Sequence, residues 1–285
     1  MSMTVLYCND PVWPRRVDAH FAAEYRLVRE LGGDSRLIDH DAIARGDVDA
    51  AIGAVPHGLG TIRYRGWMMT SPQYTALYEG LQARGATLAT DPEQFRAAHE
   101  FPGWYAHFAS VTPVSVWSSG VPDAAELFAL AGRLPGRRAM VKDYVKSRKD
   151  HPGAFLIPNT KDESTLDTVV STFVDLQGAD LCGGVVLRSF EDFEGVGDRA
   201  YESRIWWYEG VPVVIGPHPD HPNVTVAPEL GAIAPLVASF PSRFITTDLA
   251  RRADGTWRLI EVGDAQVSDF PRGTDIRPLL RALLE

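Results

Sequence analysis

The first part of the chain alternates short apolar runs with amphipathic segments. The run "MTVLYC" at residues 3–8 is rich in β-forming residues and ends at the asparagine and prolines of "NDPVWP". The next segment, "RVDAHFAAEYRLVRELGG", spaces Phe21, Tyr25 and Val28 at helical intervals and stops at two glycines. A strand, a helix and a glycine stop predict the start of a parallel α/β unit.

The same pattern continues to about residue 110. The segments "DSRLIDH" and "GLGTIRYRGWMM" predict two further strands. The segment "SPQYTALYEGLQARG" predicts a helix with Ser71 at its N-cap and Pro72 in its first turn. We therefore expect an open α/β lobe whose loops at the strand ends offer a ligand site.

Hairpins replace this pattern in the rest of the chain. Residues 138–146 predict a strand, 147–161 a loop, 164–177 a helix and 183–190 another strand. Two hairpins follow, with "YEG" and "ADG" at their turns. The predicted fold class is α/β followed by α+β.

Composition and charge exclude several classes of protein. The 285 residues include 28 Lys and Arg against 37 Asp and Glu, a net charge of −9, which argues against nucleic acid as a partner. No apolar run is long enough for a membrane helix, and the N-terminus does not resemble a signal peptide. Cys8 and Cys182 lie far apart, without disulfide or metal spacing, so we expect a cytoplasmic protein.

One short segment concentrates positive charge in this acidic chain. In "VKDYVKSRKDHPG", residues 141–153, an extended backbone puts Lys142 and Lys146 on one strand face, roughly 13 Å apart, and Asp143 on the other. Two such ammonium groups suit the oxygens of one polyphosphate, and the loop that follows suits a flap over phosphates. The alternative is a solvated edge strand. No P-loop and no G-x-G-x-x-G motif is present.

Acidic residues mark the second hairpin, "TTDLARRADGTWRLIEVGDA". A turn at "ADG" makes Asp248 and Glu261 cross-strand neighbours, with Asp264 just after the second strand. A divalent cation such as magnesium removes the repulsion between paired carboxylates; the alternative is an acidic hairpin in water. The loop "GPHPDHPN" carries His218 and His221, which are either metal ligands or ordinary loop histidines.

Arginines on two predicted strands are further candidates. Glu202 and Arg204 in "YESRIWW" share a strand face, so Arg204 either contacts a phosphate with Glu202 orienting it or forms a structural ion pair. Arg63 and Arg65 in "TIRYRGWMM" share another face, as a clamp for a substrate carboxylate or as a solvated edge.

The order of these segments resembles the ATP-grasp superfamily over most of the chain. More narrowly, "YRGWMMTSPQY", "VKDYVKS" and "VVLRSF" look like the clade of ATP-grasp proteins with one arginine and two lysines. The resemblance implies an N-terminal Rossmann-like lobe and two α+β subdomains that clasp ATP, with magnesium. It implies lobes at residues 1–110, 111–187 and 188–285. Members commonly activate a carboxylate as an acyl phosphate that an amine attacks.

The resemblance also implies roles for single residues. Lys142 and Lys146 would bind phosphates, Arg188 would be the arginine of the clade, and Arg204 would match the arginine of an E-x-R strand. Arg204 and Lys146 would serve catalysis. The segment "LRSFEDF" would be the hinge that contacts adenine and the ribose hydroxyls, through Ser189, Phe190, Glu191 and Asp192.

The metal ligands implied by the resemblance are Asp248 and Glu261, with one departure from the family. Members usually have asparagine two residues after the glutamate, where this chain has Gly263 followed by Asp264. Either Asp264 replaces that ligand, which we favour, or the second magnesium site is impaired.

The expected function is that of an ATP- and Mg²⁺-dependent carboxylate–amine ligase that forms ADP. Its substrate would be a small molecule, an amino acid or a peptide. We expect no nucleic acid and no membrane as partner, and the sequence leaves open whether the chain forms a homodimer. The alternatives are an impaired nucleotide-binding adaptor and a kinase that phosphorylates its acceptor directly.

Overall fold

The computed structural model describes the chain except for residues 1–2, 197–198, 221, 224–226 and 271–272. It divides into two compact units. The first unit consists of Met1–Ala98, Glu202–Leu249 and Glu261–Glu285, and the second of His99–Tyr201 and Ala250–Ile260. The predicted lobe limits near residues 110 and 187 stay a prediction.

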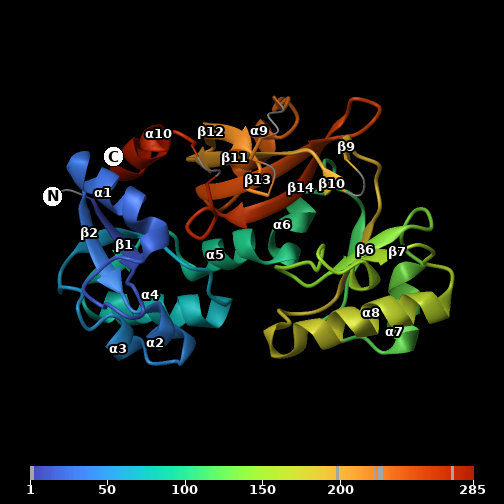
Figure 1. The fold of residues 1–285 in the computed structure, drawn as a ribbon, viewed down its shortest axis with the longest axis horizontal. Coiled ribbons are helices and arrows are strands. Elements are labelled where there is room, and N and C mark those ends of the chain that lie inside the picture. The colour runs from blue at the N-terminus through green and yellow to red at the C-terminus, as the bar shows by residue number, and fades with distance from the viewer. Residues whose placement is uncertain (1–2, 197–198, 221, 224–226, 271–272) are drawn as a thin grey trace. The chain divides into compact units, whose positions relative to one another are not determined.

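A parallel sheet forms the N-terminal part of the first unit (Figure 1). Its strand order is β2-β1-β3-β4, and each neighbouring pair is parallel. Every residue of β1 is buried, as expected for a central strand that reads as a continuous apolar run. The elements are β1 (Thr4–Cys8), η1 (Ala19–Phe21), α1 (Ala22–Glu30), β2 (Asp34–Ile38), α2 (His40–Ala44), α3 (Val48–Ala51), β3 (Gly60–Arg65), α4 (Ser71–Ala83), β4 (Ala86–Leu88) and α5 (Pro92–His99).

Helix α4 has its N-cap one residue earlier than its sequence pattern suggested. Thr70, not Ser71, is the N-cap: the Thr70 side chain accepts the N–H of Gln73, and the Gln73 side chain accepts the N–H of Thr70. This reciprocal pair is a capping box, with Pro72 in the first turn as predicted.

A second sheet of order β12-β11-β13-β14 follows in the C-terminal part. The turn "YEG" joins β11 and β12 through Glu209 and Gly210, which both have positive φ, as a two-residue hairpin requires. The C-terminal helix α10 packs against α1 (Figure 1). The elements are β11 (Glu202–Tyr208), β12 (Val211–Pro217), α9 (Ala234–Ser239), β13 (Phe244–Arg251), β14 (Trp257–Asp264) and α10 (Arg277–Leu284); the tip of the β13–β14 hairpin belongs to the second unit.

The second unit contains an antiparallel sheet of order β5-β8-β6-β7, with helices α7 and α8 packed together beside it (Figure 1). Its elements are α6 (Phe101–Phe108), β5 (Ser115–Trp117), α7 (Ala124–Ala131), β6 (Ala139–Lys142), η2 (Pro152–Ala154), β7 (Leu156–Ile157), α8 (Glu163–Gln177), η3 (Gly178–Asp180), β8 (Val186–Ser189), β9 (Gly195–Val196) and β10 (Arg199–Ala200).

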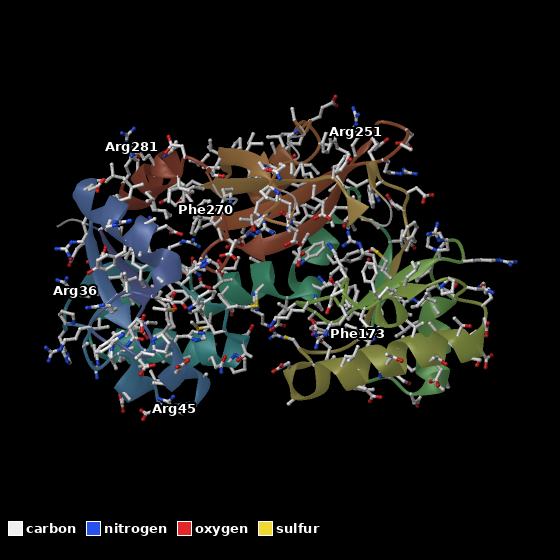
Figure 2. The ribbon with its side chains drawn as sticks, in the orientation of Figure 1. Arg36, Arg45, Phe173, Arg251, Phe270 and Arg281 are labelled. Carbon is white, nitrogen blue, oxygen red and sulfur yellow. The ribbon has the colours of Figure 1, made fainter. Side chains whose placement is uncertain are left out.

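Each unit has its own apolar core. In the first unit, Phe270 stacks on the buried Trp206 with ring centroids 3.9 Å apart, and in the second the buried Phe173 of α8 packs with the sheet residues Val141 and Leu187 (Figure 2). Among the described residues, no helix is both long enough and apolar enough to cross a membrane.

Candidate functional site

The lysine segment is a short strand followed by a turn. Strand β6 ends at Lys142, because the Asp143 carboxylate accepts the N–H groups of Val145 (2.7 Å) and Lys146 (2.5 Å), while the Asp143 N–H donates to the Lys146 carbonyl (2.9 Å). The predicted strand 138–146 is therefore too long, and Lys146 does not share a strand face with Lys142. The Lys142 ammonium lies 5.9 Å from the centre of the Phe101 ring.

Arg188 on β8 is buried and serves the second unit structurally. It is 4% exposed, and its guanidinium donates to the carbonyls of Ile260 (2.5 Å) and Leu259 (3.0 Å) and to the hydroxyl of Thr112 (2.7 Å). These carbonyls come directly before Glu261 in strand β14. Arg188 therefore fixes the backbone next to a predicted metal ligand.

The predicted hinge has two acidic side chains in different environments. Glu191 accepts two hydrogen bonds of 3.0 Å from Arg258, and Arg252 lies 3.6 Å away. Asp192 is 82% exposed and lies 3.5 Å from Arg138. Of the two, Asp192 has the more exposed carboxylate, and contact of either with a ribose stays a prediction.

The backbone of the hinge is held by neighbouring segments. The Ser189 N–H donates to the Val114 carbonyl (2.8 Å), and the Phe190 N–H donates to the Arg138 carbonyl (3.0 Å). The Arg138 guanidinium also lies 3.7 Å from the centre of the Phe190 ring. These contacts fix the path of the chain after β8.

Four side chains of the first unit, on strands β11 and β13 and directly after β12, form a charged cluster: Glu202, Arg204, His218 and Asp248. Arg204 binds Asp248 in a bidentate way, with Nε–Oδ1 and Nη2–Oδ2 distances of 2.8 Å. His218, which directly follows β12, places Nε2 2.8 Å from Arg204 Nη2 and 3.4 Å from Asp248 Oδ2. Within the part of the chain that the structure describes, Glu202, His218 and Asp248 offer ligand atoms within 4.8 Å of one another.

The charges in this cluster stabilise one another. Burial works to raise the pKa of Asp248, but the charge and hydrogen bonds of Arg204, with help from His218, hold that pKa well below its usual range. Burial likewise works to lower the pKa of His218, but the hydrogen bond and charge of Asp248 raise it. Glu261 and Glu202 add to the negative field that raises the pKa of Arg204.

The donor set of the cluster fits a divalent cation. Carboxylates are the ligands that Mg²⁺ prefers, and Asp248, Glu202 and Glu261 all contribute to the field at Arg204. Arg204 takes one acceptor site on each oxygen of Asp248, so lone pairs on both oxygens stay available to a cation. Sequence reasoning left open whether His218 is a ligand; His221 lies outside the described residues.

Asp264 does not join these carboxylates. Glu261 and Asp264 are separated by an odd number of positions in β14, so they point to opposite faces. The Asp264 carboxylate instead accepts the backbone N–H (2.9 Å) and the side-chain amide (3.0 Å) of Gln266, which contacts Tyr74. Burial raises the pKa of Asp264 to about 7. These contacts do not favour the expectation that Asp264 replaces the family's asparagine, which stays a prediction.

Hydroxyl groups fill the space beside Gly263. A Cβ atom there would lie 2.8 Å from Thr246 Oγ1 and 3.3 Å from Ser268 Oγ, and these two hydroxyls are 2.9 Å apart. A larger side chain at position 263 therefore requires that Thr246 and Ser268 move.

Arg63 and Arg65 make structural contacts within the first unit. Arg65 is 1% exposed; it binds Glu24 in a bidentate way (2.9 and 2.7 Å) and donates to the carbonyls of Ala265, Gln266 and Ser268. Arg63 donates to the Leu283 carbonyl and the Tyr208 hydroxyl. The Arg65 guanidinium is thus used by contacts inside the first unit, and a clamp of Arg63 and Arg65 for a substrate carboxylate stays a prediction.

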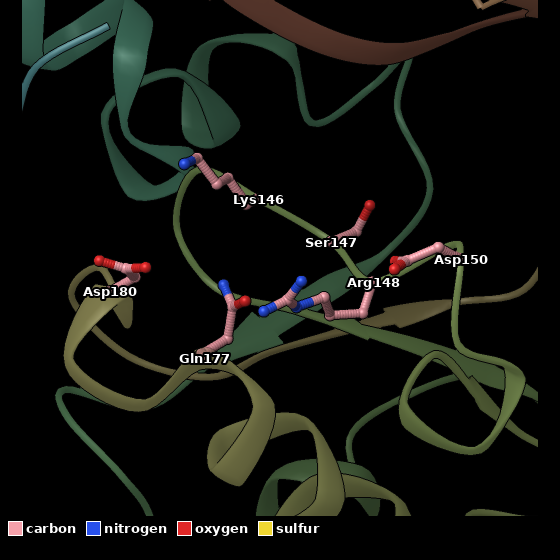
Figure 3. Close-up of a pocket in the computed structure, with 6 residues that line it drawn as sticks. All are labelled: Lys146, Ser147, Arg148, Asp150, Gln177 and Asp180. Atoms are coloured by element: carbon pink, nitrogen blue, oxygen red, sulfur yellow. The ribbon is translucent and has the colours of Figure 1, made fainter.

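The turn at residues 143–146 is called the lysine turn below. A cavity of about 160 Å³ lies between this turn and the end of α8 (Figure 3). Arg148 reaches across it and donates to the Leu176 carbonyl in the last turn of α8 (2.5 Å). The lining residues are Lys146, Ser147, Arg148, Asp150, Gln177 and Asp180.

Solved structures with this fold are similar over almost their whole length. D-cycloserine synthetase DcsG has a TM-score of 0.67 at 17% identity, covering 99% of this chain and 98% of the other. A RimK domain ATP-grasp protein from Sphaerobacter thermophilus has 0.63 at 13%, covering 99% of both chains. The ATP-grasp ligase PsnB, complexed with minimal precursor, Mg and ADP, has 0.59 at 12%, covering 98% and 96%.

At these identities the similarity concerns the fold, and no curated protein matches the sequence. A family model for an ATP-grasp domain, the third family of the clade named for its arginine and two lysines, matches residues 133–283, which is more than half of the chain. The match includes both lysines, Arg188 and the charged cluster. The chain therefore has the ATP-grasp fold and belongs to this third family of the arginine and two-lysine clade of ATP-grasp proteins.

Proposed function

We propose that this protein is an ATP- and magnesium-dependent, ADP-forming ligase that joins a carboxylate to an amine. The observation that carries the proposal is the cluster on β11 to β13, where a buried Asp248 pairs with Arg204 beside Glu202 and His218. Membership in an ATP-grasp family supports a role of this cluster in nucleotide chemistry. DcsG is named a synthetase and PsnB a ligase, which supports the same reaction class.

In this proposal each group has a limited task. Lys142 and Lys146 bind phosphate oxygens as mobile point charges, and Arg204 neutralises charge on the transferred phosphoryl group. Asp248, Glu202 and Glu261 hold magnesium, which supplies a Lewis acid that neutralises phosphate charge. No protein nucleophile is needed, because positioning and charge stabilisation carry this type of transfer.

The proposed reaction has two steps. A carboxylate oxygen of the substrate attacks the γ-phosphorus of ATP, the bond to the bridging oxygen breaks, and ADP leaves. An amine then attacks the acyl carbon, phosphate leaves, and the amine loses a proton as the amide forms. The substrate is a small molecule, an amino acid or a peptide; PsnB, a ligase of the same fold, has been complexed with a precursor peptide.

Turnover with a panel of substrates tests the proposal. The protein with ATP, Mg²⁺ and mixtures of amino acids and peptides should release ADP and phosphate in equal amounts, with a new amide detected by mass spectrometry. Asp248→Asn should lower turnover about 100-fold or more, because Arg204 and the cation lose a charged partner. The exposed Lys161→Ala is the matched control for Lys142→Ala, which should weaken ATP binding about tenfold.

Two outcomes would contradict the ligase proposal. ATP binding without ADP release across the whole panel is one of them. A stable phosphorylated product without phosphate release is the other, and it would identify a kinase.

A nucleotide-binding adaptor without catalysis is a second candidate, and one observation favours it. Position 263 has no side chain, and Asp264 points to the other face of β14, so the second metal position of the family lacks its usual ligand. For this candidate, Asp248→Asn would leave the biological effect intact while it abolishes any ATP turnover.

A further inference from the structure

Asp143, which sequence analysis placed opposite the lysines without a role, is at the centre of the lysine turn. Its side chain is fully buried, with 0% exposure. Oδ1 accepts the N–H groups of Val145 (2.7 Å) and Lys146 (2.5 Å), and Oδ2 accepts the side-chain amide of Gln177 (2.6 Å) and the N–H of Cys182 (3.3 Å). A buried carboxylate is stable when several N–H groups face it, as they do here.

These bonds join three segments of the second unit through one carboxylate. Val145 and Lys146 lie in the turn itself, Gln177 is the last residue of α8, and Cys182 precedes β8. The Asp143 N–H also closes the turn by donating to the Lys146 carbonyl (2.9 Å). The backbone of Lys146 is therefore held at its N–H and at its carbonyl by the same residue.

Tyr144 fixes the other side of the turn. Its hydroxyl donates to the Ser118 carbonyl (2.8 Å), and its N–H donates to the Cys182 carbonyl (3.2 Å). Its ring covers Gly183, where φ is +71° and where a Cβ atom would overlap the ring. The turn is thus held in place from both sides, while the exposed Lys146 side chain lines the cavity of Figure 3.

We propose that Asp143 is a positioning residue that fixes the backbone of Lys146 for contact with a phosphate group, and that Gln177 holds the Asp143 carboxylate in place. This inference rests on the proposed function, in which Lys146 binds ATP. A flexible lysine gains affinity when its backbone does not have to be ordered on binding. Asp143 acts through Lys146 and does not itself contact the nucleotide.

A double-mutant cycle in the full chain tests this coupling. The dissociation constant of ATP with Mg²⁺ is measured by calorimetry for the unmodified protein, Asp143→Asn, Lys146→Ala and the double variant. We expect about tenfold weaker binding for Asp143→Asn, because its amide presents N–H groups to Gln177 and Cys182. In the Lys146→Ala background, Asp143→Asn should change the affinity less than about twofold, because both act through one side chain.

Two further variants separate positioning from folding. Gln177→Ala removes one donor to Asp143 and should weaken ATP binding about threefold; it decides the question if Asp143→Asn does not fold. Asp175→Asn changes an exposed carboxylate on the same helix and should leave the affinity unchanged.

The outcomes distinguish this inference from the proposed function. Failure of the unmodified chain to bind ATP with Mg²⁺ would overturn the proposed function and this inference with it. Unchanged ATP affinity in folded Asp143→Asn and Gln177→Ala, or fully multiplicative losses in the double variant, would overturn only the role of Asp143.

Discussion

At the scale of single residues, two aspartates of the β13–β14 hairpin differ in charge because of their partners. Asp248 and Asp264 are both buried, at 2% and 1% exposure. Arg204 sits against Asp248 and lowers its pKa below the usual range, whereas Asp264 meets amide groups and burial raises its pKa to about 7. The direct ion pair with Arg204 thus keeps Asp248 charged, whereas at Asp264 burial outweighs the hydrogen bonds of Gln266 and the charge of Arg65.

The raised pKa of Asp264 predicts how stability depends on pH. The folded chain holds a proton on Asp264 up to about pH 7, while the unfolded chain releases it near 3.8. Stability from this group is therefore complete below pH 3.8 and is lost as pH rises through 7. Asp264→Asn, which stays neutral, should raise the free energy of unfolding at pH 8.5, relative to the unmodified chain, by about 1–3 kcal/mol.

Urea unfolding of both proteins at pH 5 and pH 8.5 checks this prediction. The difference between them should be larger at pH 8.5 than at pH 5. Asp162→Asn, at an exposed helix N-cap, is the control and should not show the same rise. Equal differences at the two pH values would contradict the assignment of a proton to Asp264.

At the scale of elements, local patterns predicted both hairpins and the longer strands and helices, but missed short elements such as α2, α3 and β7 and did not supply contacts distant in sequence. Glu209 and Gly210 form the turn that "YEG" predicted, because positive φ is a local property. The strand that ends at Lys142 was predicted to continue four residues further, to residue 146. An aspartate often ends a strand by accepting the N–H groups two and three residues later, as Asp143 does. This local signal could have placed the end of the strand at Lys142.

The charged cluster shows what the sequence alone could not supply. Arg204 and Asp248 were both predicted site residues, but their pairing joins positions 44 residues apart. His218 belongs to the cluster only because β12 pairs with β11 and ends beside Arg204. Alternation within a strand predicts which side chains share a face, and it does not predict which neighbouring strand supplies the partner.

Arg65 carries a prediction at this scale, because its guanidinium ties β3 to α1 and to the segment after β14. Arg65→Met leaves Glu24 buried without its cation and removes the guanidinium donor from the carbonyls of Ala265, Gln266 and Ser268, of which Gln266 keeps the Gly66 N–H. We expect a loss of about 3–5 kcal/mol in the free energy of unfolding, measured by urea titration.

Two comparisons make the Arg65 result specific. Arg36→Met breaks a pair with Asp34 in which the arginine is 39% exposed, and it should cost about 0–1 kcal/mol. Arg65→Met combined with Glu24→Leu should recover part of the loss, because no carboxylate then stays buried alone. A loss below about 1 kcal/mol for Arg65→Met alone would show that the Arg65–Glu24 ion pair does not stabilise the contact between β3 and α1.

At the scale of the whole molecule, net charge and local charge act in opposite directions. The chain carries 28 basic and 37 acidic residues, a net charge of −9, so a long polyanion is repelled by most of the surface. The basic residues Lys142, Lys146, Arg148 and Lys149 stand close together in sequence, but Arg148 already donates to a helix carbonyl. These four side chains form a local concentration of positive charge within eight positions of an acidic chain.

This contrast predicts a size limit for anionic ligands. Inorganic tripolyphosphate should compete with ATP for binding, because it presents the same oxygens to the lysines. A DNA duplex of about 20 base pairs should not displace ATP even at about 50 mM salt, where nonspecific binding to DNA is much stronger than at about 200 mM. Fluorescence anisotropy of a labelled ATP analogue measures both competitions. Displacement by the duplex, or indifference to tripolyphosphate, would mean that the lysine segment recognises something other than the phosphates of a nucleotide.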